Sequence, residues 1–348
     1  ASYYDSSLVD GMAGSVNTPP NKDIRWEKTT TVNVGVDFAL FRHRLSGTIE
    51  YYNKYSVDLL AAINGSPTQG FGYTTLMTNN GKMVNRGVEI TLSGEIIRQK
   101  DFSWNASLLY AFNRNKVKHI SVQPSLWDSR ISMPTSYPMV GKPLYGIYAY
   151  KWAGLNENGD PQVYDAENNV TSGPARDYHA LVYCGTTVPI HNASLTNVLR
   201  YKGFEFSAML ILDAGHKLRS SNIPSINMSN GRITSTAKGI VDRWTQPGDV
   251  TDVPRLLFSN DTENFNTHRT ELYRYSDLFV YDASNIRLSN ISLAYRVPAH
   301  WCKKISLSGA RLQFNVENVA TFAFDSKANY DLGGKVKPNY VWGLYLNF

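Results

Sequence analysis

Cysteine, charge and long apolar runs are all scarce in this sequence, and each shortage excludes a class of protein. Only two cysteines occur among the 348 residues, Cys184 and Cys302, and neither has a second Cys or a His at metal-ligand spacing. A zinc site is therefore not supported, and the two thiols are either free or joined in a pair that the sequence does not define. No run of about 18 consecutive apolar residues occurs, so no transmembrane helix is expected.

Motifs of enzymes and of nucleic-acid-binding proteins are also missing. There is no nucleophile elbow, no His-Glu-x-x-His, no phosphate loop and no Gly-rich dinucleotide turn, and the seven His are scattered. We therefore predict that the chain is not an enzyme and needs no metal or other cofactor. The net charge of +6 comes from dispersed Lys and Arg, without a basic run or a recognisable nucleic-acid module. Nucleic acid is accordingly not an expected partner.

The residue types that are abundant favour β-strands. Aromatic residues make up 12% of the chain, with 22 Tyr, whereas charged residues make up only 18%. Residues 339–348 alternate between a heavy apolar face and a lighter one, which is the period of a strand. An uncovered apolar strand invites aggregation in water, so we expect a neighbouring strand and a lipid bilayer to cover this one. Its apolar face comprises Tyr340, Trp342, Leu344, Leu346 and Phe348.

The same alternation recurs along the chain and predicts an all-β fold of about nine long antiparallel strands. The ten steps from Phe102 to Phe112 span about 33 Å along a strand, or about 25 Å of height at a tilt of about 40°. This height matches the apolar band of an outer-membrane β-barrel. The predicted strands cover residues 30–40, 45–52, 88–93, 102–112, 193–201, 204–213, 290–297, 311–317 and 339–348.

Short and long connections alternate strictly between these strands, as expected when one rim of a barrel faces the periplasm and the other faces the cell exterior. We expect the proline-rich segment 121–190 to be a folded excursion on one side of the sheet. The short connections are 42–44, 98–101, 202–203 and 298–305, and the long ones are 61–82, 121–190, 219–278 and 323–338. An aromatic girdle is predicted beside the short turns, formed by Phe41, Trp104, Tyr201, Phe204, Trp301 and Phe348.

The number of strands also predicts that the barrel is larger than this chain. Nine is odd, whereas closed single-chain bacterial barrels have even strand numbers. The chain also begins without an initiator Met. We therefore expect residues 1–348 to be the carboxyl-terminal part of a barrel whose first strands pair with those at 30–40 and 339–348.

Five stretches together resemble a known family. In chain order they are 24–37 (IRWEKTTTVNVGVD), 51–60 (YYNK followed by DLL), 85–89 (NRGVE), 148–155 (YAYKWAGL) and 283–293 (ASNIRLSNISL). As a set they resemble the carboxyl-terminal barrel half of SusC/RagA-like TonB-dependent transporters of Bacteroidetes. The resemblance implies a transmembrane antiparallel β-barrel of about 22 strands with long extracellular loops and an amino-terminal plug. The plug and the first strands are absent from these residues.

The resemblance also implies a function and a set of partners. Such proteins are similar in importing oligosaccharides or oligopeptides across the outer membrane, with energy relayed through TonB. A SusD-like surface lipoprotein caps the barrel, and the amino-terminal part of the same transporter supplies the plug and the contact with TonB. Outer-membrane lipid surrounds the barrel.

Aromatic residues in the excursion are candidates for contact with the transported ligand. Flat rings with polar tips suit a passing solute, but the same rings can instead pack the excursion onto the barrel mouth. The substrate-binding candidates are Trp127, Tyr145, Tyr148, Tyr150 and Trp152.

Polar residues on the lighter strand faces are expected to point into the lumen. There they contact the solute or the plug, or else pair across strands and are merely solvated. The lumen-facing candidates are Asp37, Glu50, Glu89, Arg296, Arg311, Gln313 and Glu317.

Residues 156–160 (NENGD) superficially match an oxygen-rich calcium loop. They lack the downstream bidentate Glu that such a loop requires, and Asn-Gly between alternating segments is typical of a hairpin turn. A turn is therefore predicted here.

Two other classes of protein fit parts of the pattern. A passive porin or surface-binding barrel has the same strands without an energised gate, and a plug upstream distinguishes the two. A soluble all-β sandwich is the third interpretation, and heat-modifiable gel migration separates it from a barrel.

Overall fold

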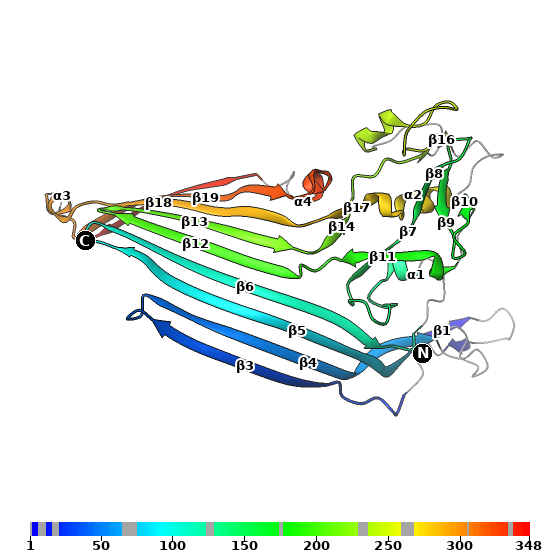
Figure 1. Cartoon of the computed structure of the whole chain (residues 1–348), viewed down its shortest axis with the longest axis horizontal. Helices are drawn as coiled ribbons and strands as arrows, with labels where there is room; N and C mark the ends of the chain where they lie inside the picture. Colours follow the sequence, from blue (N-terminus) through cyan, green and yellow to red (C-terminus); the bar gives the residue numbers. More distant parts are fainter. Residues whose placement is uncertain are drawn as a thin grey trace.

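The computed structural model describes residues 2–5, 12–15, 21–64, 75–122, 129–173, 177–228, 236–258, 268–304, 306–332 and 337–348. A long curved sheet runs across the molecule, and a smaller folded region lies at one end of it (Figure 1). None of the helices in these ranges is both long and apolar enough to span a lipid bilayer.

The sheet has nine strands within the described residues, and each strand pairs with its neighbours in chain order. All of these pairs are antiparallel. The predicted fold class is therefore confirmed, including its number of strands. The strands are β3 (Lys28–Leu40), β4 (Leu45–Asn64), β5 (Thr75–Arg98), β6 (Phe102–His119), β12 (His191–Tyr201), β13 (Phe204–Ala214), β18 (Asn285–Arg296), β19 (Gly309–Ala323) and β20 (Asn339–Asn347).

The predicted loop over 61–82 is wrong at both of its ends. Strand β4 continues to Asn64 and β5 already begins at Thr75, so much of this segment is paired strand, while 65–74 lie outside the described residues. Ala61 pairs with Thr78 and Ile63 with Leu76. Polar Thr and Asn residues suggest a loop, but above the membrane they are compatible with a strand, because the ladder hydrogen bonds come from the backbone.

Side-chain alternation gives the sheet an apolar face and a polar face. In the large sheet, the register aligns one outward residue from each of the eight strands β3 to β19 in a continuous row. Val36, Ile49, Ile286 and Phe322 in this row are exposed, and the other four are partly buried. Exposed apolar side chains of this kind are expected on a surface that lipid covers. The row is Val36, Ile49, Ile90, Tyr110, Ala193, Leu212, Ile286 and Phe322.

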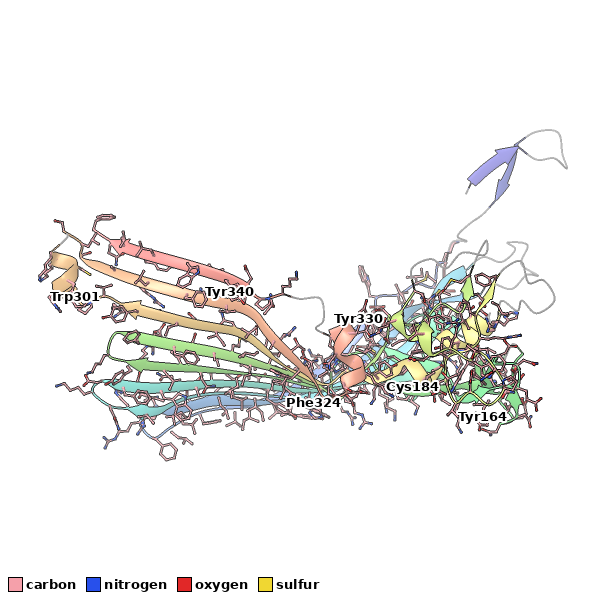
Figure 2. All side chains as sticks on the ribbon, turned by 90° about the horizontal axis from the view of Figure 1, so that it is seen from above. Tyr164, Cys184, Trp301, Phe324, Tyr330 and Tyr340 are labelled. Atoms are coloured by element: carbon pink, nitrogen blue, oxygen red, sulfur yellow. The ribbon has the colours of Figure 1, made fainter. Side chains whose placement is uncertain are left out.

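The short connections all lie at one end of the sheet, as the sequence predicts. Residues 41–43 turn with positive φ, and α3 (Ala299–Lys303) lies between β18 and β19. Phe41, Tyr201, Phe204, Trp301 and Phe348 are each at least half exposed at this end, and Figure 2 shows Trp301 at its tip. Trp104 lies one row further in and donates its Nε1–H to Asn197 Oδ1 at 3.1 Å, which satisfies a polar group on the apolar face.

The long connections form a folded region at the opposite end, here called the loop domain, made of the described parts of 129–190 and 215–284. This confirms the predicted folded excursion. Its core contains Tyr148, Tyr150, Val163, Leu181 and Leu272.

The loop domain contains short strands and helical turns. Its elements are α1 (Ser129–Ser132), β7 (Gly146–Tyr150), β8 (Trp152–Leu155), β9 (Pro161–Tyr164), β10 (Val170–Thr171), η2 (Tyr178–Ala180), β11 (Leu181–Thr186), β14 (Lys217–Arg219), β15 (Asn227–Met228), η3 (Lys238–Asp242), β16 (Leu257–Phe258), α2 (His268–Arg274), η4 (Asp277–Phe279) and β17 (Val280–Asp282). Outside it lie β1 (Ser2–Asp5), β2 (Met12–Ser15), η5 (Ser326–Ala328) and α4 (Asn329–Leu332).

Candidate functional site

The polar face of the sheet carries every residue that the sequence assigns to the lumen. Asp37 pairs with Thr48, and Glu50 pairs with Glu89, in register positions of one face. The β18–β19 register places the other four on that same face. These four are Arg296, Arg311, Gln313 and Glu317. The alternation of the sequence thus places all seven on one surface, and their role toward a solute stays a prediction.

Several charges on this face pair with each other across strands. Glu205 accepts from Arg200 Nε at 2.7 Å and from Arg311 at 3.1 Å. Asp213 accepts from Asn192 at 2.7 Å and lies 3.7 Å from Arg287. These side chains remain partly exposed, so each pair contributes little to stability. For Arg311 the geometry favours the cross-strand pairing that the sequence leaves as an alternative.

Like charges lie directly opposite each other at two places on the polar face. Glu50 lies directly opposite Glu89 on β4 and β5, and Asp37 lies on β3 beside them. On β18 and β19, Arg296 lies directly opposite Arg311. The polar face therefore carries carboxylates on the first strands and guanidinium groups near the short turns of the later ones.

Two of the aromatic candidates for substrate contact are unavailable to a ligand in this structure. Tyr148 is 1% exposed and Tyr150 is 0% exposed, both inside the core of the loop domain. The Tyr148 hydroxyl accepts from the backbone N–H of Met139 at 3.2 Å, and burial raises the pKa of Tyr148. Both rings therefore contribute to the packing of the loop domain. Packing is the alternative role that the sequence leaves open for them.

The other aromatic candidates differ in their accessibility. Tyr145 is 50% exposed. Trp152 is half-buried, lies 5.9 Å from the Tyr273 ring, and donates its Nε1–H to Asp252 at 2.9 Å. Trp127 lies outside the described residues. Tyr145 therefore offers the largest aromatic surface for a ligand among the described candidates.

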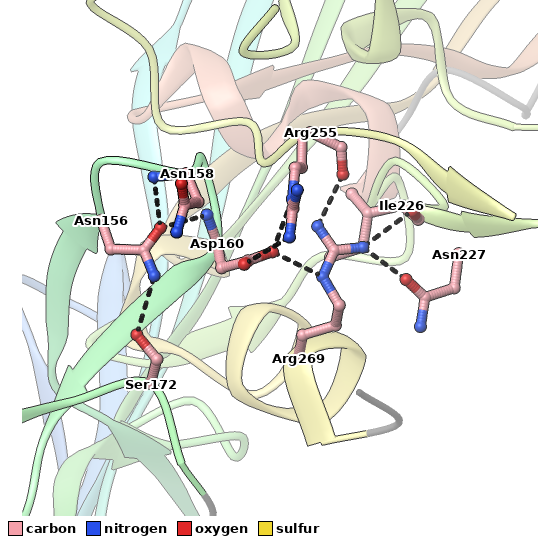
Figure 3. A network of polar contacts seen from close by, with 8 residues as sticks. All are labelled: Asn156, Asn158, Asp160, Ser172, Ile226, Asn227, Arg255 and Arg269. Carbon is pink, nitrogen blue, oxygen red and sulfur yellow. Dashed lines mark hydrogen bonds and ion pairs between the residues drawn. The ribbon is translucent and has the colours of Figure 1, made fainter. Parts of the chain in front are cut away.

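The segment 156–160 forms the predicted turn rather than a calcium loop. The Asn156 side chain accepts from the backbone N–H of Asn158 and of Asp160, each at 2.9 Å, and Gly159 has φ +73°. The Asp160 carboxylate points away from this turn, toward two arginines (Figure 3).

These arginines form an ion-pair network that sequence reasoning missed. Asp160 binds Arg255 at 2.8 Å and Arg269 at 3.1 Å. The Arg269 side chain is only 2% exposed and also donates to the carbonyls of Ile226 and Arg255. Burial lowers the pKa of Arg269, and Asp160 opposes that effect. The network joins the turn before β9, helix α2 and the segments before β15 and β16, so it fixes the shape of the loop domain.

A cavity lies on the polar face where the sheet meets the loop domain. Its volume is about 430 Å³, and Leu60, Met77, Met83, Val117 and Leu144 supply its apolar lining. Met83 and Val117 lie on the polar-face side of β5 and β6 by register. A second cavity of about 450 Å³ in the loop domain is lined by hydroxyl and guanidinium groups, including Ser220, Thr270 and Arg274. Concave sites of this size accept parts of an extended solute.

The two cysteines lie in different parts of the fold. Cys184 belongs to β11 and Cys302 to α3, and both are free. Burial raises the pKa of the Cys184 thiol to about 11, so it is almost entirely protonated at neutral pH. Within the described ranges, no cluster of three His, Cys, Asp or Glu side chains has the arrangement of a metal site.

The sequence matches a known family over most of its length. Residues 1–319 match the family described as TonB dependent receptor-like, beta-barrel. TonB-dependent receptor P3 of Formosa agariphila is 25% identical over 346 residues, which cover 93% of this chain and 33% of that protein. TonB-dependent receptor SusC of Bacteroides thetaiotaomicron is 25% identical over 312 residues, which cover 86% of this chain and 29% of that protein. The chain thus spans about a third of the length of these curated relatives.

A solved structure agrees with this match at the level of the fold. The RagAB peptide transporter superposes with a TM-score of 0.75 at 22% sequence identity, over 100% of this chain and 38% of that chain. The antiparallel sheet, its alternating faces and the loop domain at one rim are thus parts of one known architecture. The chain belongs to the TonB-dependent receptor β-barrel family, whose members are proteins of the bacterial outer membrane.

Proposed function

We propose that residues 1–348 form the carboxyl-terminal part of an outer-membrane transporter that imports oligosaccharides or oligopeptides with energy from TonB. In this proposal the complete barrel has about 22 strands, and the missing part contains the first strands and the plug. In the part of the chain that the structure describes, β3 and β20 each pair on one side only, and this supports the proposal because unpaired strand edges are not tolerated in lipid.

The observation that carries the proposal is that one face of the sheet is apolar and the other is polar. In this proposal the apolar face presents exposed side chains such as Val36 and Phe322 to lipid, while the polar face presents charges and amides to a wide aqueous passage. A passage of this width admits solutes larger than those of small porins, so a movable plug is needed to keep it closed between transport events.

The loop domain and the cavity of about 430 Å³ supply the outer binding surface. Apolar residues of the cavity such as Met83 and Leu144 can contact an apolar side chain of a peptide or the face of a sugar ring. Tyr145 follows Leu144 in the sequence and is exposed. We propose that a SusD-like lipoprotein covers the loop domain and holds the solute against this surface. The similar fold of the RagAB peptide transporter supports the oligopeptide class, and the oligosaccharide class rests on the resemblance of the sequence.

The chain contributes binding and passage rather than chemistry. The Asp160 network and the paired charges of the polar face are structural or solvated, and neither places a nucleophile beside a base. We therefore propose a transport role without catalysis.

Uptake by the complete protein tests this function. Cells that express it should accumulate labelled oligosaccharide or oligopeptide, and deletion of TonB should abolish accumulation while surface binding persists. Uptake that is independent of TonB would favour a passive channel, and binding without any uptake would favour a surface-binding barrel. Either result overturns the proposal.

The cavity is tested in the same cells. Met83→Asp and Leu144→Asp place a charge in its apolar lining and should weaken solute binding. The matched control is Met209→Asp, a partly buried Met on the polar face but in the middle of the sheet. Equal loss in both sets would show that the cavity has no special part in binding.

A further inference from the structure

Cations begin on the apolar face of the sheet directly beyond its last aromatic row. On β6 the outward residues run from Phe102 to Phe112, and the next two outward positions are Arg114 and Lys116. Arg86 on β5 lies directly opposite Arg114 in the register. All three are exposed on the same face, and together they are called the outer basic patch.

The charge of the outer basic patch is uncompensated in the described part of the chain. None of its three residues forms an ion pair there, and Arg86 donates only to the amide oxygen of Asn53, at 3.0 Å. The nearby carboxylates Glu50 and Glu89 lie on the opposite face of the same strands. Three cations that lack carboxylate partners and point outward favour an anionic ligand outside the barrel wall.

The height of the patch matches the lipid headgroup layer. Arg114 lies two residues beyond Phe112, which is about 7 Å along the strand and about 5 Å of height at a tilt of about 40°. Lys116 lies about 10 Å above Phe112 by the same reckoning. The polar layer on each side of a bilayer is about 5–7 Å thick. If Phe112 marks the edge of the hydrocarbon, both cations lie among or just above the headgroups.

A cavity opens beside the patch where two strands separate. On the side of β6 that faces β12, the backbone N–H of Asn113 donates to Ile190 O at 2.9 Å. The next backbone bond on this side is at Val117, whose N–H donates to Lys142 O at 2.9 Å in the connection after β6. The cavity between these bonds has a volume of about 480 Å³. Its lining combines the cations Arg114, Lys116 and Lys142 with apolar side chains such as Val188 and Ile190.

The floor of this cavity is held by aromatic contacts. Tyr110 and His191 are joined by a hydrogen bond of 2.8 Å between the hydroxyl and Nδ1. The His191 ring also lies 5.3 Å from that of Phe112. The aromatic row therefore forms a firm apolar edge directly below the cations, which is the arrangement that a lipid with a charged head and a hydrocarbon tail requires.

We propose that the outer basic patch is a binding site for a phosphorylated glycolipid of the outer leaflet. The phosphate groups of this lipid would lie between Arg86, Arg114 and Lys116, since arginine binds phosphate through two parallel hydrogen bonds. The attached sugar would occupy the adjacent cavity, and the acyl chains would cover the apolar row beneath. The site does not depend on which solute is transported.

Binding of defined lipids to the complete receptor in delipidated detergent micelles tests the proposal. The probes are diphosphorylated lipid A, its dephosphorylated form, phosphatidylglycerol and inorganic phosphate, and native mass spectrometry counts the lipids that remain bound. We expect retention of diphosphorylated lipid A, and at least a tenfold loss of it in the combined variant Arg86→Gln, Arg114→Gln and Lys116→Gln. Dephosphorylated lipid A should be retained no better by the native receptor than by this variant.

A matched control removes three exposed cations at the opposite rim. It combines Arg42→Gln, Lys100→Gln and Lys202→Gln, changes the net charge equally, and should leave lipid retention unchanged. Retention of diphosphorylated lipid A that is equal in the patch variant and the native receptor would overturn the proposal. So would an equal loss in the control, or preferential binding of phosphatidylglycerol or of free phosphate. Heat-modifiable migration verifies that each variant forms the barrel.

Discussion

Substitution of Val36 by arginine tests the assignment of the two faces most directly. Val36 is 61% exposed and lies four residues from each end of the outward apolar run from Val32 to Leu40. Four residues are about 13 Å of strand, or about 10 Å of height at a tilt of about 40°. The position is thus near the centre of the apolar band, where arginine on the lipid face costs about 2–4 kcal/mol. This cost corresponds to a loss of roughly 30-fold to 900-fold in the folding equilibrium.

The control is Asn33→Arg, which places the same side chain on the polar face of the same strand, in register with Tyr52. There the guanidinium stays in water, so we expect little change. The complete receptor is refolded into lipid vesicles and unfolded with urea, with the folded fraction measured from heat-modifiable migration. Equal cost for Val36→Arg and Asn33→Arg would refute the face assignment.

Three further predictions concern the loop domain. Arg269→Ala leaves Asp160 with one of its two arginines and removes a nearly buried cation, so local stability should fall by about 3–5 kcal/mol, measured by amide hydrogen exchange in α2 and β9. Hydrogen bonds from the backbone and hydroxyl of Thr245 and from the backbone of Gln246 hold the pKa of Asp249 below its usual value. Its stabilising effect is therefore complete above the unfolded pKa of about 4 and is lost as pH falls through the lower folded pKa. Amide protection at Thr245 should decrease in that acid range and not between pH 5 and 8. In a Cys302→Ser background, alkylation of Cys184 by iodoacetamide should be slow at pH 7 and should rise about tenfold per pH unit toward the pKa of about 11; a rate that is already maximal at pH 8 would contradict the burial of this thiol.

The strands of the sheet were predictable because their signal is local. Alternation between Phe102 and Phe112, or between Tyr340 and Phe348, depends only on neighbours in the sequence, and it also fixes which side chains share a face. The upper halves of β4 and β5 lack this signal, since backbone pairing continues there above the apolar band with mixed side chains. The end of β4 was therefore predicted too early and the beginning of β5 too late.

The interior of the loop domain was not predictable from the same patterns. Tyr148 and Tyr150 have the composition of a binding surface, yet residues more than a hundred positions away, such as Leu272, bury them. Asp160 likewise finds its partners Arg255 and Arg269 at 95 and 109 residues of separation. A single sequence carries no periodic signal for contacts of this kind, whereas the turn around Gly159 was recognisable from its own residues.

The strict neighbour-to-neighbour order of the nine strands has a consequence for assembly. Each strand can pair with the strand that precedes it in the sheet, so each pairing step closes only the loop between two consecutive strands. Closure of the proposed complete barrel joins β20 to a strand that precedes β3, at least about 300 residues away, and this costs about 4 kcal/mol more in loop entropy than a four-residue turn. Cylinder closure should therefore be the late and slow event in biogenesis, and hairpin formation the early and fast one.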